Sequence, residues 1–290
     1  RGSSNFRGPL IQEWLKSGAE VFALAPDFDT RSRTAVKKLG AVPVDIYMSR
    51  TGKNPISDLW SIASLTYTFR RLQLDTVFCY YIKPVIYGML AGRIANVTNR
   101  YSLIAGGGYV FSNQSKYRLL HRILKTAACF MCKRGLRHAT KILFQNDDDL
   151  KLFVDLKLVS KDRTFVTGGT GVDLDILKQI IPNTDNITFI LVARLLREKG
   201  IIDYVDAARI VRTETTNVTF RLVGNFDTSP GGISKTQVDS WVKDGVIEWP
   251  GEVSDVYSWL TSSSVFVLPS YYREGVPRST QEALAAGLPV

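Results

Sequence analysis

The feature that most restricts the fold of this chain is an alternation of short apolar runs with amphipathic helical stretches, from one end to the other. The apolar runs are continuous and of strand length, as in residues 186–194 (NITFILVAR). Continuous apolar strands separated by helices indicate parallel sheets that are covered on both faces. We therefore predict strands at residues 19–26, 41–48, 75–81, 100–106, 141–146, 163–169, 186–194, 217–224, 246–251 and 265–270.

Two such sheets are expected, because 290 residues exceed what one ordinary core organises. Residues 178–186 (KQIIPNTDN) carry the Pro, Asn and Asp that are typical of a linker. The prediction is an α/β protein of two doubly wound Rossmann-like domains, residues 1–181 and 182–290, facing a cleft. The chain begins at a helix and ends at the start of a strand. We interpret it as truncated at both ends, without the first strand of one domain and the C-terminal part of the other.

Composition narrows the class of protein. Hydrophobic residues make up 45% and charged residues 22% of the chain, which indicates a folded globular protein. The apolar runs are well short of the ~20 residues that span a bilayer. Three cysteines are too few for a disulfide framework and favour a reducing compartment. Cys129 and Cys132 form a Cys-x-x-Cys, but they lie in a helical run without a second ligand pair, so we reject a redox or metal role.

The net charge of +10 is concentrated in one part of the chain. Residues 76–146 contain eleven Lys and Arg and no Asp or Glu, whereas the rest has 26 basic and 27 acidic residues. This imbalance indicates an anionic partner. Within it, Arg118, Arg122 and Lys125 share one face of a predicted helix, and the opposite face is apolar. The pattern fits a helix lying on an anionic membrane surface, although the apolar face could equally pack into the core.

Two glutamates, Glu274 and Glu282, lie eight residues apart near the end of the chain. They flank the start of a helix predicted from Pro277 or Arg278 to Ala286. Amides at a helix start bind anions, and ionised carboxylates accept hydrogen bonds from sugar hydroxyls. The pair therefore suits a ligand with both phosphates and sugar hydroxyls. Residues 279–282 also form a Ser-x-x-Glu capping box, and spacing alone leaves the two interpretations equal.

Two cations occupy a matching position at the start of the second domain. Arg194 lies at the carboxyl end of the predicted strand 186–194, and Lys199 follows just before a helix. Ligands of open α/β sheets bind beyond the carboxyl ends of the strands. Two permanent cations at such an edge suit a diphosphate.

Several stretches together resemble glycosyltransferase family 4, in particular its bacterial members that build capsule and O-antigen sugars on a lipid carrier. The closest are LVARLLREKGI, RLVGN, GEVSDVYSWL and VFVLPSYYREGVPRSTQEALAAGLPV, within 186–290. Looser similarity extends through NFRGPLIQEW, KPVIYG, GGGYVF, FQNDDDL and GGTGVDLD. The resemblance implies the GT-B fold, a nucleotide-sugar donor, retention of anomeric configuration and no metal requirement.

The resemblance also implies roles for individual residues. Glu274 matches the first glutamate of the family's E-x7-E motif, which contacts the transferred sugar, and Glu282 matches the second, which holds the ribose hydroxyls. Arg194 and Lys199 match the phosphate-binding pair. The amides nearest to the sugar and diphosphate would be those of Gly275, Val276 and Arg278. This interpretation accounts for four side chains with one ligand, whereas a capping box explains only Glu282.

Three further motifs receive weaker interpretations. Many relatives place a histidine against the donor sugar, but this chain has only His121 and His138, both in the basic helical stretch, and we assign them no role. Residues 106–108 (GGG) could admit an acceptor phosphate. Residues 147–149 (DDD) are expected in the first turn of a helix, where acids favour the dipole, rather than at a metal.

The function predicted from the sequence is retaining transfer of a sugar, an N-acetylhexosamine in its narrower form, from a UDP-sugar to a polyprenyl-diphosphate-linked acceptor. The setting would be bacterial surface polysaccharide synthesis at the cytoplasmic face of the plasma membrane, with no cofactor and no nucleic-acid partner. Two alternatives stay open. One is a GT-B transferase with a soluble acceptor. The other is a non-catalytic nucleic-acid-binding module that uses the basic residues of 76–146.

Overall fold

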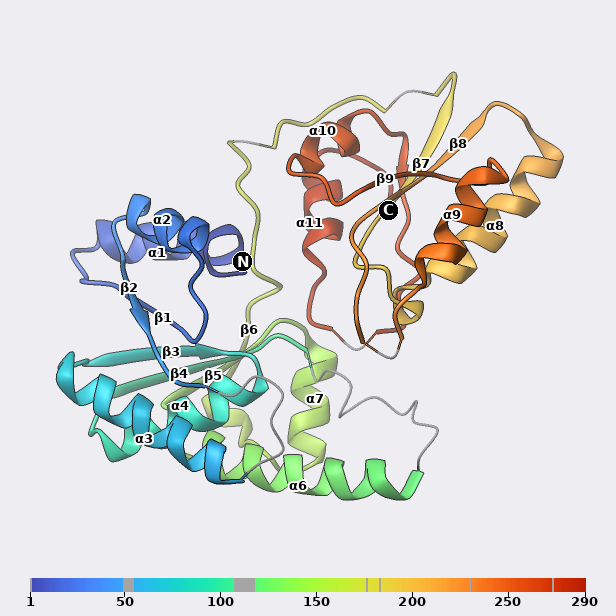
Figure 1. Cartoon of the computed structure of the whole chain (residues 1–290). Helices are drawn as coiled ribbons and strands as arrows, with labels where there is room; N and C mark the ends of the chain where they lie inside the picture. The colour runs from blue at the N-terminus through green and yellow to red at the C-terminus, as the bar shows by residue number, and fades with distance from the viewer. Residues whose placement is uncertain are drawn as a thin grey trace. The chain divides into compact units, whose positions relative to one another are not determined.

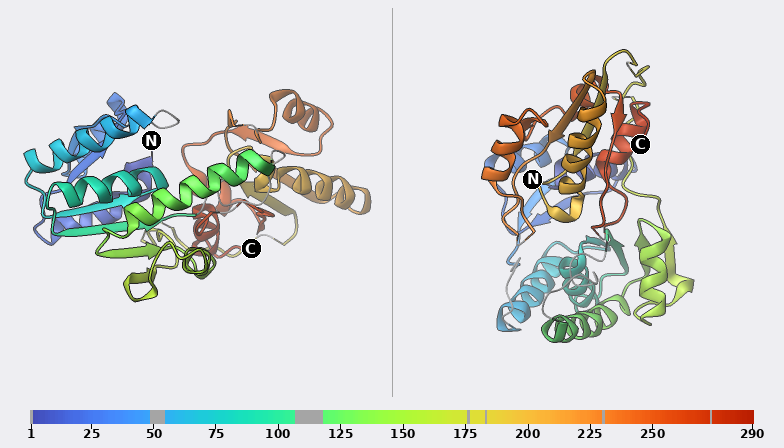
Figure 2. Two further views of the ribbon diagram at one scale, coloured as in Figure 1. Left: turned by 90° about the horizontal axis from the view of Figure 1, so that it is seen from below. Right: turned by 90° about the vertical axis from the view of Figure 1, so that its right-hand side faces the viewer.

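The chain divides into two compact units, Arg1–Thr170 (unit 1) and Gly171–Val290 (unit 2) (Figures 1 and 2). The computed structural model describes residues 2–48, 55–106, 118–175, 177–182, 184–229, 231–272 and 274–290. The junction predicted between residues 181 and 182 lies inside unit 2. Hydrogen bonds tie the preceding stretch to that unit, since Gly171 N donates to Gln281 Oε1 (3.0 Å) and Ile180 N to Ala286 O (2.9 Å).

Unit 1 contains two parallel sheets with the strand orders β1-β2 and β3-β4-β5-β6. The strands are β1 (Phe22–Ala25), β2 (Val42–Asp45), β3 (Thr76–Tyr80), β4 (Asn99–Ile104), β5 (Lys141–Phe144) and β6 (Thr164–Val166). The helices are α1 (Gly2–Lys16), α2 (Thr30–Lys38), α3 (Pro55–Arg71), α4 (Ile82–Ile94), α6 (Arg118–Leu136) and α7 (Asp147–Asp155). Parallel neighbours need crossover connections, and these helices supply them.

Strand β3 shows why the middle of its sequence is apolar. Phe78 packs edge-on against Trp14 of α1, with ring centroids 5.5 Å apart. On the other face Cys79 lies so close to Gly88 of α4 that a Cβ there would overlap its sulfur. Successive side chains of a strand point to opposite faces, so this strand is covered by a helix on each side. On the α4 face, α3, α4 and α6 form one layer in which α4 packs against both neighbours (Figure 1).

Unit 2 contains one parallel sheet with the strand order β10-β7-β8-β9. Its strands are β7 (Ile187–Val192), β8 (Val218–Val223), β9 (Glu248–Gly251) and β10 (Val265–Phe266). Its helices are α8 (Ile201–Glu214), α9 (Lys235–Lys243), α10 (Val256–Thr261) and α11 (Arg278–Ala285). Leu191 packs into a core with α8 and α9, whereas the adjacent Ile190 packs with α10 and α11. This sheet is also covered on both faces.

The predicted class, α/β with doubly wound parallel sheets, is confirmed. Each predicted strand is present and begins or ends within a few residues of its expected bounds, β10 being the most shortened. The three aspartates 147–149 occupy the first turn of α7, with Asn146 as its N-cap, as predicted. The predicted final helix corresponds to α11, and Gly287 follows it with a φ of +84°.

Two findings bear on the predictions from composition. Cys129 and Cys132 are free cysteines of α6, and burial raises the pKa of Cys132 to about 12. A thiol with so high a pKa is protonated at neutral pH and is a poor nucleophile. None of the helices in the described stretches has an apolar segment long enough to cross a membrane.

Candidate active site

The candidate site of unit 2 lies where the winding of its sheet changes direction. From β7 the chain crosses to β8 on one side, while β10 pairs with β7 on the other side. Loops that follow adjacent strands on either side of such a switch point separate and leave a crevice at the carboxyl edge of the sheet. The loop after β7 carries Arg194 and Lys199, and the loop after β10 carries Glu274. The sheet topology therefore brings the predicted residues of both loops to one edge.

The two loops are held together through their backbones. The amides of Tyr271 and Tyr272 both donate to the carbonyl oxygen of Glu198, at 3.0 and 2.9 Å. Gly200 has a φ of +73°, and a Cβ at this position would overlap the carbonyl oxygen of Pro269. Only glycine combines a left-handed backbone with so close an approach. The contact fixes the start of α8 against the end of β10.

Lys199 and Glu274 form an ion pair across these loops. Lys199 is 7% exposed, and its ammonium lies 5.6 Å from the ring centroid of Tyr272. Ser270 Oγ donates to the same Glu274 oxygen at 3.3 Å. A buried ion pair adds little stability over an apolar pair of the same size, because both charges lose their hydration. Its presence at a ligand-binding edge therefore points to a functional rather than a stabilising role.

Arg194 lies just beyond the carboxyl end of β7, as predicted, and pairs with an acid that the sequence interpretation missed. Its Nη1 lies 2.6 Å from Asp227 Oδ2, and the two side chains are 59% and 13% exposed. Asp227 belongs to the loop after β8. At Gly224 this loop contacts the loop after β7. A Cβ on Gly224 would overlap the carbonyl oxygen of Ala193. Asp227 orients the arginine while leaving its other N–H groups available.

Glu282 is part of α11 and does not cap that helix. The N-cap of α11 is Pro277, which makes no capping hydrogen bond, so Ser279 lies inside the helix and the capping-box alternative is wrong. Instead, Arg278 Nε donates to Glu282 Oε1 at 2.7 Å. Side chains of a helix lean toward its N-terminus, so Glu282 extends back toward the first turn. There the carboxylate lies near the start of the helix, where backbone amides favour anionic ligands.

Four of the predicted residues contact one another in two pairs, and Arg194 contacts an acid that was not predicted. Lys199 contacts Glu274, Arg278 contacts Glu282, and Arg194 contacts Asp227. Gly275 and Val276 lie between β10 and α11 as predicted, and both make further interactions. Each of these three cations is paired with a carboxylate. A ligand that carries phosphates and hydroxyls could replace both kinds of partner at once.

Other predicted residues belong to unit 1. Arg122 and Lys125 lie on α6, where Arg122 is exposed and Lys125 half-buried. Arg118 begins the same helix, but its side chain is outside the described residues, as are residues 107 and 108 of the glycine run. Among the described residues no cluster of three or more His, Cys, Asp or Glu side chains is arranged to hold a metal ion.

Comparisons with known proteins identify the class of protein that has this fold and this carboxyl edge of the unit 2 sheet. Residues 186–290 match the family described as "Glycosyl transferases group 1", and residues 8–146 match "Glycosyl transferase 4-like". The two matches together span most of the chain. It belongs to the nucleotide-sugar glycosyltransferases of the GT-B fold and of the family 4 type, which confirms the resemblance seen in the sequence.

Some similar proteins match nearly the whole chain, and others match only part of it. The N,N'-diacetylbacillosaminyl-diphospho-undecaprenol alpha-1,3-N-acetylgalactosaminyltransferase of Campylobacter jejuni is 26% identical over 300 residues, covering 98% of this chain and 75% of the relative. The putative colanic acid biosynthesis glycosyltransferase WcaL of Salmonella typhimurium is 30% identical over 111 residues, 36% of this chain and 27% of its own. The structure of Anabaena HepE in complex with UDP-glucose superposes with a TM-score of 0.72 at 16% identity, covering 99% and 76% of the two chains.

Proposed function

We propose that this glycosyltransferase transfers an N-acetylhexosamine from a UDP-sugar to a polyprenyl-diphosphate-linked acceptor, with retention of anomeric configuration and without a metal. The observation that carries the proposal is the Lys199–Glu274 ion pair at the switch point of the unit 2 sheet. The name of the Campylobacter relative, which pairs an N-acetylgalactosaminyl group with an undecaprenol-diphosphate acceptor, supports the choice of sugar and lipid. Synthesis of a bacterial surface polysaccharide is the proposed setting.

The donor diphosphate is assigned to the cations. When the bond from the anomeric carbon to the phosphate oxygen breaks, the leaving UDP gains negative charge. Arg194, Lys199 and the first amides of α11 would bind this charge more tightly in the transition state than in the ground state. Lys199 would exchange its Glu274 partner for a phosphate oxygen. Such an exchange keeps a buried ammonium satisfied throughout.

The sugar and ribose are assigned to the carboxylates. Glu274, once separated from Lys199, would accept hydrogen bonds from hydroxyls of the transferred sugar and favour positive charge at the anomeric carbon. Glu282 would accept from the ribose hydroxyls. The acceptor hydroxyl forms the new bond to the anomeric carbon and gives its proton to a phosphate oxygen of the leaving UDP. Retention would appear in the product as an unchanged anomeric configuration, which proton NMR of the glycolipid distinguishes.

The proposed location is the inner face of the plasma membrane, as a peripheral protein. The exposed cation Arg122 and the half-buried Lys125 of α6 support this location, together with Arg118 at the start of that helix. Each cation near an anionic surface contributes about 1 kcal/mol of binding. Neutralising all three should therefore release the protein from vesicles that contain anionic lipid.

The experiment that tests the donor site is calorimetric titration with UDP, GDP and ADP. We expect UDP to bind, and Arg194→Ala and Glu282→Ala each to weaken its binding about tenfold or more. Arg209→Ala is the matched control, because Arg209 is an exposed arginine of α8 that pairs with Asp206 one turn away. If no nucleotide binds, or if both variants bind as tightly as the parent, the site assignment fails.

A further inference from the structure

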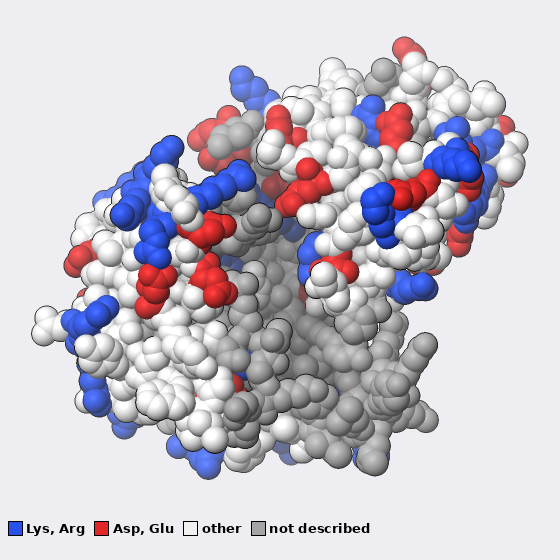
Figure 3. Space-filling model, viewed as in Figure 1, with Lys and Arg blue, Asp and Glu red and all other residues white. Residues whose placement is uncertain are grey.

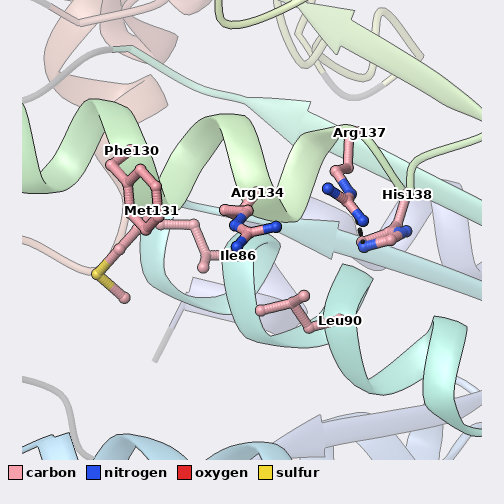
Figure 4. Close-up of a pocket in the computed structure, with 7 residues that line it drawn as sticks. All are labelled: Ile86, Leu90, Phe130, Met131, Arg134, Arg137 and His138. Carbon is pink, nitrogen blue, oxygen red and sulfur yellow. Dashed lines mark hydrogen bonds between the residues drawn. The ribbon is translucent and has the colours of Figure 1, made fainter.

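A groove between α4 and α6 of unit 1 is not used by the proposed transfer reaction. It encloses about 390 Å³ and is lined by Ile86, Leu90, Phe130, Met131, Arg134, Arg137 and His138. The two helices approach closely at Gly135, where a Cβ would lie 2.8 Å from the Cα of Ile86. Phe130 and Met131 lie at one end of the groove and Arg137 and His138 at the other, with Arg134 between them (Figure 4).

The floor of the groove is apolar and its rim is cationic. Phe130 is 61% exposed although it is a large apolar side chain, and the guanidinium of Arg134 lies 5.4 Å from its ring centroid. No carboxylate is among the described residues that line the groove. Exposed aromatic and aliphatic side chains beside unpaired cations are typical of surfaces that meet anionic amphiphiles.

Several arginines surround His138 at one end of the groove. Arg137 Nε donates to His138 Nε2 at 3.2 Å. Burial lowers the pKa of His138, and so do Arg137, Arg93, Arg100 and Arg134. Arg100 is engaged with backbone carbonyls, including that of His138 at 2.6 Å. Such crowding of like charges is unfavourable without an anion and would be relieved by one.

The charge of this end contrasts with the surface of unit 2. Over α8 and α9 both signs are interspersed (Figure 3), and two cations there pair with acids on the same helix, Arg209 with Asp206 and Lys235 with Asp239. Among the described side chains, Arg134 and Arg137 have no such carboxylate partner. A general requirement for solubility would produce the mixed pattern of α8 and α9. The groove instead has the charge pattern of a site for a negatively charged group.

The groove lies toward the amino edge of the unit 1 sheet. Helices that connect parallel strands run back to the amino edge of the sheet, so α4 and α6 end near the starts of β4 and β5. The hydrogen bond from Arg100, at the start of β4, to the carbonyl of His138 places the cationic end at that edge. Substrates of open α/β sheets bind at the carboxyl edge. The occupant of the groove is therefore not the reacting end of a substrate.

We propose that the α4–α6 groove binds the headgroup phosphate of an anionic membrane phospholipid. Arg134, Arg137 and His138 hold the phosphate, and the floor formed by Ile86 and Leu90 takes the first methylene groups of the chain. Phe130 inserts at the level of the headgroups. A free phosphate would leave the apolar floor unused, and a nucleic acid would need a wider track of cations. The inference names the lipid group that the protein contacts at the membrane. It rests on the proposed function, from which the membrane location is taken.

The test measures partition of the protein onto phosphatidylcholine vesicles that contain phosphatidylglycerol at about 30 mol%. We expect Arg134→Gln/Arg137→Gln to lower the partition coefficient about 25-fold, since each cation near such a surface contributes about fivefold. Phe130→Gln changes no charge and is expected to lower it about fivefold or more. Lys37→Gln/Lys38→Gln is the matched control, because both lysines are exposed on α2 of the same unit; it should lose only a few-fold.

The outcomes separate a lipid site from simpler explanations. Equal losses in the arginine pair and the Lys37/Lys38 pair, or no loss in Phe130→Gln, would mean that only net charge attracts the protein, and would overturn the proposal. Displacement of the protein from vesicles by inorganic phosphate, or tight binding of a short RNA that the arginine substitutions abolish, would overturn it as well. UDP titration of the same variants is expected to match the parent. Failure of UDP to bind the parent would count against the transferase proposal alone.

Discussion

Lys199 and Glu274 form an ion pair although 75 residues separate them in the sequence. The pair exists because β7 and β10 are neighbours in the sheet, and because the loops that follow them share backbone hydrogen bonds. A lysine with 7% exposure needs a negative partner in the free protein. In the proposed reaction the diphosphate supplies that partner, and Glu274 turns to the sugar. One contact therefore links the stability of the edge to its chemistry.

Removal of the charge of Glu274 tests this link. Glu274→Gln keeps the size and an acceptor oxygen but leaves the Lys199 ammonium without a counter-charge. We expect a loss of about 2–4 kcal/mol in the free energy of unfolding and a fall in transfer rate of at least ~100-fold. Denaturant titration and a radiolabelled transfer assay measure the two effects.

The control for this prediction is Glu248→Gln. Glu248 pairs with Arg221 at 3.1 Å, but its side chain is 59% exposed. Exposed pairs contribute less than about 1 kcal/mol, so this variant should keep nearly full stability and full activity. Equal destabilisation by both substitutions would remove the special status of the Lys199–Glu274 pair.

A second prediction concerns the backbone contact between the two loops. Gly200→Ala places a Cβ against the carbonyl of Pro269 at a φ of +73°. We expect it to cost more than about 3 kcal/mol of folding stability and to abolish UDP binding, since the loops must separate. Gly245→Ala is the matched control, because its φ is +67° but nothing lies within 4 Å of the added Cβ.

The difference between the two glycine variants isolates the contact from backbone strain. Gly245→Ala should cost only the left-handed conformation, about 1 kcal/mol, and should bind UDP normally. If Gly200→Ala is no more destabilising than Gly245→Ala, the two loops do not pack closely at Gly200.

A third prediction concerns Asp227 as a positioning residue. Asp227→Asn weakens its hold on Arg194, whose guanidinium then samples orientations that do not face the diphosphate. We expect the Kd of UDP to rise about fivefold while the melting temperature changes little, because Arg194 is mostly exposed. Asp206→Asn, which removes the partner of Arg209, should leave the Kd unchanged. A tighter complex in Asp227→Asn would mean that Asp227 competes with the ligand.

The fourth prediction is a pH dependence that arises from His138. Burial and the surrounding Arg137, Arg93, Arg100 and Arg134 lower its pKa. A histidine with a depressed pKa stays neutral in the folded state when the unfolded chain already binds a proton. Its contribution to stability is therefore complete above the usual pKa of about 6.5 and is lost progressively as the pH falls below it. His138→Gln should reduce the stability difference between about pH 8 and about pH 5.5.

Lipid binding should show the opposite pH dependence. A headgroup phosphate favours protonated His138, so vesicle partition should increase as the pH falls, and His138→Gln should flatten this increase. Partition that is independent of pH in the parent protein would argue against contact between His138 and the phosphate.

Much of the fold could be predicted because buried parallel strands have continuous apolar sequences. Ile187–Val192 illustrates this, since both faces of β7 meet a core and all its residues except Thr188 are apolar. The ends of strands are harder to predict from sequence. The predicted strand 265–270 corresponds to β10 only at Val265–Phe266, and Val267 to Ser270 form the loop that reaches Glu198. Burial fixes the middle of a strand, whereas hydrogen bonds at its end depend on a distant partner.

The candidate site was predictable to the extent that it is local. Glu274 and Glu282 could be located from spacing and resemblance, and Arg194 from its place after a strand. Asp227 could not, because its pairing with Arg194 depends on the loops after β7 and β8 meeting at Gly224. The α4–α6 groove was missed for the same reason, although the cations of residues 76–146 had indicated an anionic partner.

The most direct measurement for the central claim is a crystal structure of the protein with UDP. We predict nitrogen atoms of both Arg194 and Lys199 within about 3.2 Å of diphosphate oxygens, the carboxylate of Glu282 at the ribose, and Lys199 released from Glu274. A nucleotide bound elsewhere, or a diphosphate at this edge with the Lys199–Glu274 ion pair intact, would contradict it.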